Sequence, residues 1–191
     1  MRKQTLLIAC VTVLLSLCSF AQTKEADKAK EPPTKLEAFL ARKGRLVIKD
    51  SYELGGIRGT GKLDLDALAI YEPGAETQKT KGIRIQITEA GRLETSNTSF
   101  LDLDEVETSS KAISYMLDTA NKWKTAGRDA YSEVIYSTKG DFKLGFYQKA
   151  SERGAFASSG YVGKADAFFE LEELLHLKAL LDKGLTVLGQ K

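Results

Sequence analysis

The sequence has little cysteine and histidine, and it lacks a second long apolar run. Both cysteines, Cys10 and Cys18, lie within the first 21 residues, and His176 is the only histidine among 191 residues. Segment 1–21 has the three parts of a cleavable signal peptide: a basic start, a short apolar stretch and a small-x-small site that ends at Ala21. The sequence therefore predicts an exported chain whose mature form has lost both cysteines.

Without cysteine, the mature chain has no disulfide, no thiol nucleophile and no thiolate ligand for a metal ion. Secreted animal domains of this size usually carry disulfides, so a cysteine-free export favours a bacterial envelope, either periplasmic or extracellular. The alternative is a lipid anchor at Cys18, although Leu17 stands where a lipoprotein site has a small residue. No later segment reaches the roughly 20 apolar residues that span a bilayer, so we expect no transmembrane segment in the mature chain.

The sequence has no excess of one charge once the signal is removed. It contains 28 Lys and Arg against 26 Asp and Glu, and Arg2 and Lys3 belong to the signal, which has no acidic residue. The mature chain is therefore neutral with His176 uncharged. Because nucleic-acid binding depends mainly on neutralising phosphates, we expect no nucleic-acid partner.

Composition divides the rest of the chain into a linker and one domain. Residues 22–33 are polar and end with two prolines, which is typical of a linker with too little apolar surface to bury. Residues 34–191 are expected to form a single domain. Two halves of that domain are suggested by the pattern, at 45–124 and 130–188.

Three helices are expected in this domain. Thr34 and Glu37 have the spacing of a capping box for a short helix. A long amphipathic helix is predicted over 101–123, with Asp102 as its N-cap. A second, leucine-rich helix is predicted over 166–183.

Alternating apolar and polar residues predict β-strands on both sides of the long helix. The connections are too short for crossover helices, so the strands should be antiparallel. The fold class is therefore α+β, with antiparallel sheet or sheets and two packing helices. The expected strands are 46–48, 52–57, 63–71, 83–87, 131–137, 142–148 and 155–159.

The two longer helices are entered by the same pattern of apolar, acidic, Leu, acidic, Glu and aliphatic residues. It begins at Leu101 and again at Phe169, 68 residues later. A tandem repeat of sheet followed by helix explains this, and so does the preference of helix N-termini for acidic residues. In topology alone, the order resembles that of single-strand nucleic-acid binders of the Whirly type, which implies such a role if the chain is not exported.

Few residues carry a motif for catalysis. Segment 56–62 has the spacing of a phosphate-binding loop, but Leu63 replaces the magnesium-binding Ser or Thr and a strand follows where a helix is required. Its glycines are better explained by a tight turn. His176 is expected on the wet side of its helix, and no serine has a recognisable basic partner. No cofactor is expected.

Carboxylates are the remaining option for a metal site or an enzyme. Asp64 and Asp66 lie two residues apart on a predicted strand and hence on one face, where they could hold a calcium ion or act as the acid and base of a hydrolase. The same chemistry is open to the acidic residues at the start of the long helix. Those residues are Asp102, Asp104, Glu105 and Glu107.

Aromatic residues gather in the second half of the domain. Tyr136 and Tyr147 are candidates for an exposed platform that binds sugar or peptide. The sequence favours an exported, non-catalytic module that binds a protein, peptide or glycan of the envelope. The alternatives are a carboxylate- or metal-dependent hydrolase and, without export, a single-strand nucleic-acid binder.

Overall fold

Two four-stranded antiparallel sheets and three helices make up the part of the chain that the structure, a computed structural model, describes: residues 33–91, 94–126 and 129–189. The expected signal peptide and all of the expected linker except Pro33 lie outside the described residues. Residues Pro32–Lys191 form one unit. No helix of the described residues is long and apolar enough to cross a membrane.

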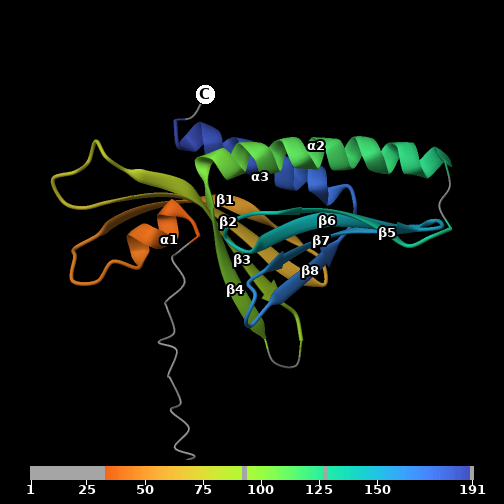
Figure 1. Cartoon of the computed structure of the whole chain (residues 1–191), viewed down its shortest axis with the longest axis horizontal. Coiled ribbons are helices and arrows are strands. Elements are labelled where there is room, and N and C mark those ends of the chain that lie inside the picture. Colours follow the sequence, from red (N-terminus) through yellow and green to blue (C-terminus); the bar gives the residue numbers. More distant parts are fainter. Residues whose placement is uncertain (1–32, 92–93, 127–128, 190–191) are drawn as a thin grey trace, which may run out of the picture. The chain divides into compact units, whose positions relative to one another are not determined.

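Each sheet is a simple meander that is followed by a helix (Figure 1). This order confirms the expected α+β class with antiparallel sheets and packing helices. The elements are α1 (Lys35–Leu40), β1 (Ile48–Arg58), β2 (Gly61–Tyr71), β3 (Thr80–Glu89), β4 (Thr95–Asp102), α2 (Leu103–Ala126), β5 (Ser132–Ser137), β6 (Phe142–Lys149), β7 (Glu152–Ser159), β8 (Ala165–Phe169) and α3 (Glu173–Val187).

The main core lies between the inner faces of the two sheets and the helices α2 and α3. From the first sheet it takes the alternating residues that the sequence predicts, such as Leu63 and Leu65 on β2 and Ile85 on β3, all fully buried. The second sheet contributes Phe142, Leu144 and Phe146 together with four alanines of β7 and β8. The small alanine side chains let β7 and β8 approach the first sheet closely.

The helices α2 and α3 pack side by side above the two sheets (Figure 1). The predicted apolar stripe of α2, including Val106, Ile113 and Met116, is buried, and the expected polar side is exposed. Four leucines of α3 are buried, whereas Leu185 is half-buried and Leu175 is 62% exposed. The leucine-rich face of α3 is therefore narrower than the sequence suggests.

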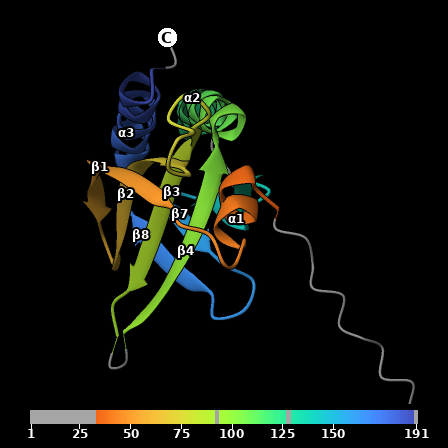
Figure 2. The same ribbon diagram turned by 90° about the vertical axis from the view of Figure 1, so that its left-hand side faces the viewer.

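The outer face of the first sheet is covered at one end by α1 (Figure 2). The expected capping box is confirmed: the Thr34 hydroxyl accepts from the Glu37 backbone N–H, and the Glu37 carboxylate accepts from the Thr34 backbone N–H. Leu36 and Phe39 then pack on Leu68 and other apolar residues of the sheet in a second, smaller core. This end of β2 is thus buried on both faces.

The first strand was divided wrongly in the sequence-based prediction. In place of strands at 46–48 and 52–57 there is one strand, β1, and its register shifts between Glu53 and Gly55. Gly55 has a φ of +132°, which favours glycine and permits this bulge. Leu46 precedes the strand and is 74% exposed.

The start of the last helix was also predicted wrongly. The helix begins at Glu173 rather than at 166, and the residues before it form β8. Ala165, Ala167 and Phe169 alternate into the core along this strand, while Phe168 lies on the opposite face at 47% exposure. In the sequence, the adjacent apolar residues Phe168 and Phe169 hide the alternation of this strand, and the segment was therefore predicted as the start of a helix.

The packing of α1 on the first sheet gives a first testable prediction. Leu36→Ala removes a fully buried side chain from the smaller core, and we expect it to lower the free energy of unfolding by about 2–5 kcal/mol. Urea denaturation followed by circular dichroism measures this change. Leu40→Ala, at a 42% exposed position of the same helix, is the matched control and should cost less than about 1 kcal/mol; equal effects would contradict the packing argument.

Candidate functional site: an aromatic sheet face

The two carboxylates predicted to bind metal lie on the outer face of the first sheet. Asp66 accepts two hydrogen bonds from Arg84, at 3.0 and 2.5 Å, and Asp64 forms an ion pair of 2.6 Å with Lys62. Each carboxylate is thus already neutralised by a neighbouring cation. Within the described ranges, no group of three or more potential metal ligands occurs.

Asp64 also lines a polar hollow of about 570 Å³ near the β1–β2 turn, together with Arg58, Gln86 and Thr88. Segment 56–62 forms this turn and leads directly into β2, as expected, rather than into a helix. Thr60, at the tip of the turn, makes two hydrogen bonds to the backbone of Phe168. The Thr60 hydroxyl accepts from the Phe168 N–H, and the Thr60 N–H donates to the Phe168 carbonyl. The turn therefore protects the edge of β8.

The two tyrosines predicted to form one platform lie on opposite faces of the second sheet. Tyr136 pairs with Leu144 on the inner face, and its hydroxyl lies 2.7 Å from the Thr108 hydroxyl of α2. Tyr147 pairs with Glu133 on the outer face. The sequence separation of the two tyrosines does not show which face of the sheet each one occupies, because that depends on how the strands pair. The structure does not bring Tyr136 and Tyr147 together.

Tyr147 instead belongs to a group of aromatic residues that spans the outer face of the second sheet. Each strand of this sheet or its flank contributes one ring to this group, which we call the aromatic band. Its exposed members are Tyr131 at 57% and Phe168 at 47%, next to Ile135 at 50%. The aromatic band consists of Tyr131, Tyr147, Phe156 and Phe168.

The rings of the aromatic band form two pairs. Tyr131 and Tyr147 are nearly parallel, with an interplanar angle of 26° and ring centroids 6.1 Å apart. Phe156 and Phe168 are tilted by 43° at 6.4 Å. Both distances are in the range of favourable aromatic contacts.

Two glycines lie under the central rings. Gly145 pairs with Phe156, and Gly154 pairs with Tyr147. A Cβ atom on Gly145 would come within 2.8 Å of the Phe156 ring, and one on Gly154 would lie 2.7 Å from the Tyr147 hydroxyl oxygen. Because a glycine has no side chain, each ring can pack over the neighbouring strand, and both rings are half-buried there.

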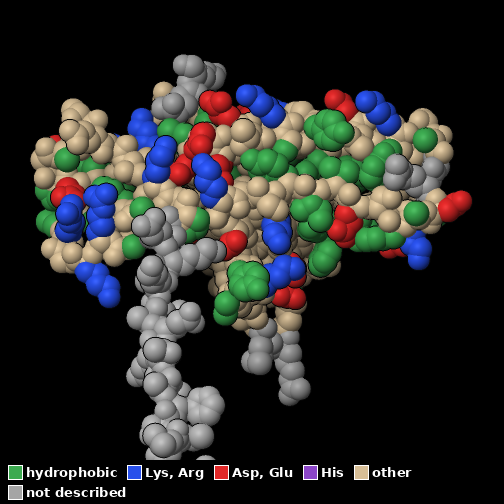
Figure 3. All heavy atoms as spheres, in the orientation of Figure 1, with side chains coloured by type: hydrophobic (Ala, Val, Ile, Leu, Met, Phe, Trp, Pro, Cys, Tyr) green, Lys and Arg blue, Asp and Glu red, His purple; other side chains and the backbone are tan. Residues whose placement is uncertain are grey.

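Charged side chains of both signs surround the aromatic band. Two are acidic and two are basic, and Glu133 also accepts a hydrogen bond from the Tyr131 hydroxyl. These rim residues are Glu133, Lys143, Lys149 and Glu152, all exposed. The same mixture of signs is visible over the surface drawn in Figure 3. The rim is neutral and rich in hydrogen-bonding groups.

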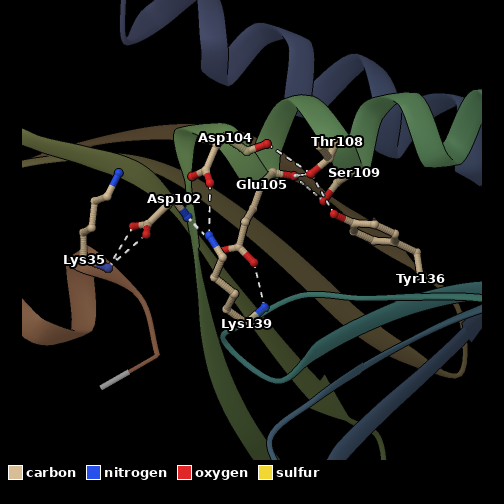
Figure 4. Close-up of polar contacts among 8 residues, drawn as sticks. All are labelled: Lys35, Asp102, Asp104, Glu105, Thr108, Ser109, Tyr136 and Lys139. Carbon is tan, nitrogen blue, oxygen red and sulfur yellow. Dashed lines mark hydrogen bonds and ion pairs between the residues drawn. The ribbon is translucent and has the colours of Figure 1, made fainter. Parts of the chain in front are cut away.

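A second polar cluster joins the elements at the start of α2 (Figure 4). Asp102 directly precedes α2, but its carboxylate caps a different helix: both oxygens accept from the Lys35 N–H of α1, at 3.0 and 3.1 Å. The prediction that Asp102 caps the long helix was therefore wrong in its target. Since β4 brings α1 and α2 together, only the tertiary structure decides which helix the carboxylate meets.

Glu105 completes this junction from the first turn of α2. One carboxylate oxygen accepts from the Lys139 N–H at 2.6 Å, and the other accepts from the Asp102 N–H at 3.3 Å. Glu105 is 5% exposed, so these bonds tie the β5–β6 turn to the first half of the chain in a buried setting. Within the acidic cluster, Glu105 and Asp102 therefore act as structural joints between elements.

Asp104 stands at the exposed side of the junction. The ammonium of Lys139, which lies 3.0 Å from the carboxylate, lowers the pKa of Asp104 from its ordinary value. A lowered carboxyl pKa stabilises the fold at pH values above about 4, and the effect is lost as the pH falls through the folded-state pKa. The contribution is small, because both side chains are exposed.

A groove of about 910 Å³ opens beside the junction, between the β2–β3 connection and the ends of α2 and α3. Its two main cations already have partners. Lys79 bonds Asp50 at 2.8 Å, and Lys81 donates to the Leu188 carbonyl at 2.7 Å. The groove thus has the contacts of a structural seam, and the aromatic band is the better candidate for a binding surface.

His176 lies on α3 with its side chain half exposed and its Nδ1 atom 3.2 Å from a Glu173 carboxylate oxygen. This agrees with the expected position on the wet side of the helix. The sequence did not single out Tyr131, Phe156 and Phe168 as residues that share the outer face with Tyr147. The signal that could have found them is the glycine opposite each central aromatic residue, which shows only once the strands are paired.

No protein-family model, no curated protein and no solved structure matches the chain. The evidence for function therefore comes from the residues of the aromatic band and their surroundings.

The buried junction gives the second prediction. Glu105→Ala leaves the N–H groups of Lys139 and Asp102 without their acceptor, and we expect a loss of about 1–3 kcal/mol in the free energy of unfolding. Chemical denaturation at neutral pH measures this loss. Asp104→Asn, one residue away and exposed, is the control; a cost as large as that of Glu105→Ala would show that the buried carboxylate has no special role.

Proposed function

We propose that the mature chain is an exported, non-catalytic binding module whose ligand is a glycan. The ligand packs on the aromatic band of the second sheet. The observation that carries this proposal is the run of four aromatic rings on the outer face of the sheet, in which the half-buried central rings Tyr147 and Phe156 pack over Gly154 and Gly145 and the flanking rings Tyr131 and Phe168 are exposed. A flat aromatic surface suits the C–H faces of sugar rings, because the π-face is electron-rich and the C–H groups carry partial positive charge.

The rim of the aromatic band favours a glycan over the other ligand classes. A single-stranded nucleic acid would also stack on such rings, but it requires a positively charged surface to follow its phosphates. The rim has equal numbers of acidic and basic residues, and the mature chain has no net positive charge. Carboxylates and ammonium groups beside a ring suit the hydroxyl groups of a sugar, which both donate and accept hydrogen bonds.

A peptide or protein ligand usually adds a strand to a free sheet edge or fills a groove. On β8 the edge is occupied by the Thr60 turn. The aromatic band lies on the open face of the sheet, where a flat ligand is the better fit.

Export is proposed from segment 1–21, with a soluble mature chain in the periplasm or outside the cell. Lipid attachment at Cys18 is the alternative. Support comes from the basic start, the apolar stretch and the cleavage site ending at Ala21.

We also propose that the two sheet-and-helix units are a tandem repeat. In support, Leu101 and Phe169 both lie at the C-terminal end of the fourth strand of their sheet. The acidic residues that follow each of them lead into the helix. Backbone superposition of the two halves in an experimental structure tests this; helices that pack on opposite faces of their own sheets would contradict it.

The third prediction concerns ligand binding. Tyr147→Ala and Phe168→Ala should each lower the affinity for a soluble oligosaccharide of the envelope by about tenfold, because each removes a stacking face. Isothermal titration calorimetry or fluorescence gives the Kd. Tyr115→Ala removes a tyrosine that is 66% exposed on α2 and should leave the Kd unchanged. If Tyr115→Ala weakens binding as much as Tyr147→Ala, the ligand does not use the aromatic band.

The fourth prediction concerns export. Expression of the full chain in a bacterial host, followed by cell fractionation and mass spectrometry, should give a periplasmic or secreted product that begins at Gln22. A product that begins with a diacylated Cys18 would establish the anchored alternative. Full-length protein in the cytoplasm would refute export and revive nucleic-acid binding.

A further inference from the structure

We infer that the aromatic band contains two separate sugar subsites and that its ligand is therefore an extended chain of sugar rings rather than a single sugar. This inference rests on the proposed function and deepens it. It follows from the division of the band into a tyrosine pair and a phenylalanine pair that lie on different strands.

The tyrosine subsite is formed by Tyr131 and Tyr147 at the β5 side of the sheet. Its hydroxyl groups and the neighbouring Glu133 carboxylate provide donors and acceptors beside the rings. Lys149, two residues beyond Tyr147 on the same face, adds a cation. This subsite can both stack on a sugar and bind its hydroxyl groups, so it distinguishes one sugar from another.

The phenylalanine subsite is formed by Phe156 and Phe168 at the β8 side. Its rings stand in one row across the sheet with Gly145 and Ile135. Neither phenylalanine has a polar atom on its ring, so this subsite stacks on a sugar without selecting for its hydroxyl groups.

The two subsites are neighbours across the central strands. Tyr147 pairs with Gly154, two residues before Phe156, so the two rings occupy diagonal positions on β6 and β7. The four strands, at about 4.8 Å spacing, span about 14 Å across the aromatic band. The midpoints of the two pairs are two strand spacings apart, about 10 Å, which is the length of about two linked sugar rings, so one sugar ring cannot be centred on both subsites.

The geometry points to a chain of β-1,4-linked hexose rings. In such a chain the large substituents lie in the plane of each ring, so both ring faces present C–H groups. The chain is also extended and flat, which matches rings laid down on a sheet. A chain that bends sharply between successive rings cannot lie across both subsites at once.

A length series tests the inference with the full mature protein. The probes are β-1,4-linked N-acetylglucosamine oligomers of one, two, four and six rings. We expect the affinity to rise by about tenfold or more between the shortest and the four-ring oligomers, as the second subsite becomes occupied, and to level off afterwards. Phe168→Ala should lower the affinity for the long oligomers and leave that for the single sugar unchanged.

The outcomes separate the inference from the proposed function. Binding that is equal for one ring and six rings would overturn the two subsites while leaving a glycan module in place. No binding to any oligomer, or to insoluble glycan of the envelope, would overturn both. Tighter binding to single-stranded DNA, weakened by salt, would replace the glycan with a nucleic acid.

Gly154 gives a sharper test of the tyrosine subsite. In the Gly154→Ala variant the new Cβ would lie 2.7 Å from the Tyr147 hydroxyl oxygen and 2.9 Å from its Cζ atom, and no backbone atom is as near. The Tyr147 ring must therefore lift from the sheet while the fold is kept. We expect Gly154→Ala to weaken binding of the four-ring oligomer several-fold, with the unfolding transition nearly unchanged.

The double variant Gly154→Ala/Tyr147→Ala completes the cycle. If Gly154 acts only by positioning Tyr147, the double variant should bind like Tyr147→Ala alone. An additional loss in the double variant would mean that Gly154→Ala disturbs the sheet itself. A Gly154→Ala variant with the affinity of the parent chain would show that the flat position of Tyr147 is not required, and it would sink the tyrosine subsite.

Discussion

Packing of two sheets against a shared pair of helices is the constraint on which the rest of this structure depends. Residues 22–191 contain no cysteine, so the fold rests on apolar burial and hydrogen bonds without a disulfide. Leucine and isoleucine side chains of the first sheet meet phenylalanine and alanine side chains of the second in one core beneath α2 and α3. Each sheet therefore has one face that must be apolar and one that is free to differ.

The two outer faces differ in what they can do. The outer face of the first sheet is covered at one end by α1, and elsewhere it carries paired charges such as Asp66 with Arg84. The outer face of the second sheet instead carries aromatic rings over glycines. Similar sheet-and-helix units thus have unequal outer faces, and that of the second sheet presents a group of aromatic rings with Ile135 in the same row.

The buried junction around Glu105 lies at the acidic start of α2 and joins the two halves of the chain. Two of the carboxylates there already bind backbone N–H groups: Asp102 accepts from α1, and Glu105 accepts from the β5–β6 turn. Asp102 and Glu105 thus serve to join elements. Glu105 accepts both from the Asp102 N–H, three residues before it, and from the Lys139 N–H, 34 residues away.

The sequence by itself determined the α+β class, the antiparallel strands, the capping box at Thr34 and the buried stripe of α2, because these depend on local periodicity and on contacts within a few residues. Only the tertiary structure decided that β1 is continuous, that β8 exists and that Tyr136 and Tyr147 face opposite ways. Strand register sets which face a side chain occupies, and a shift of one residue reverses it. The aromatic band exists only through that register, since it sets Tyr147 over Gly154 and Phe156 over Gly145.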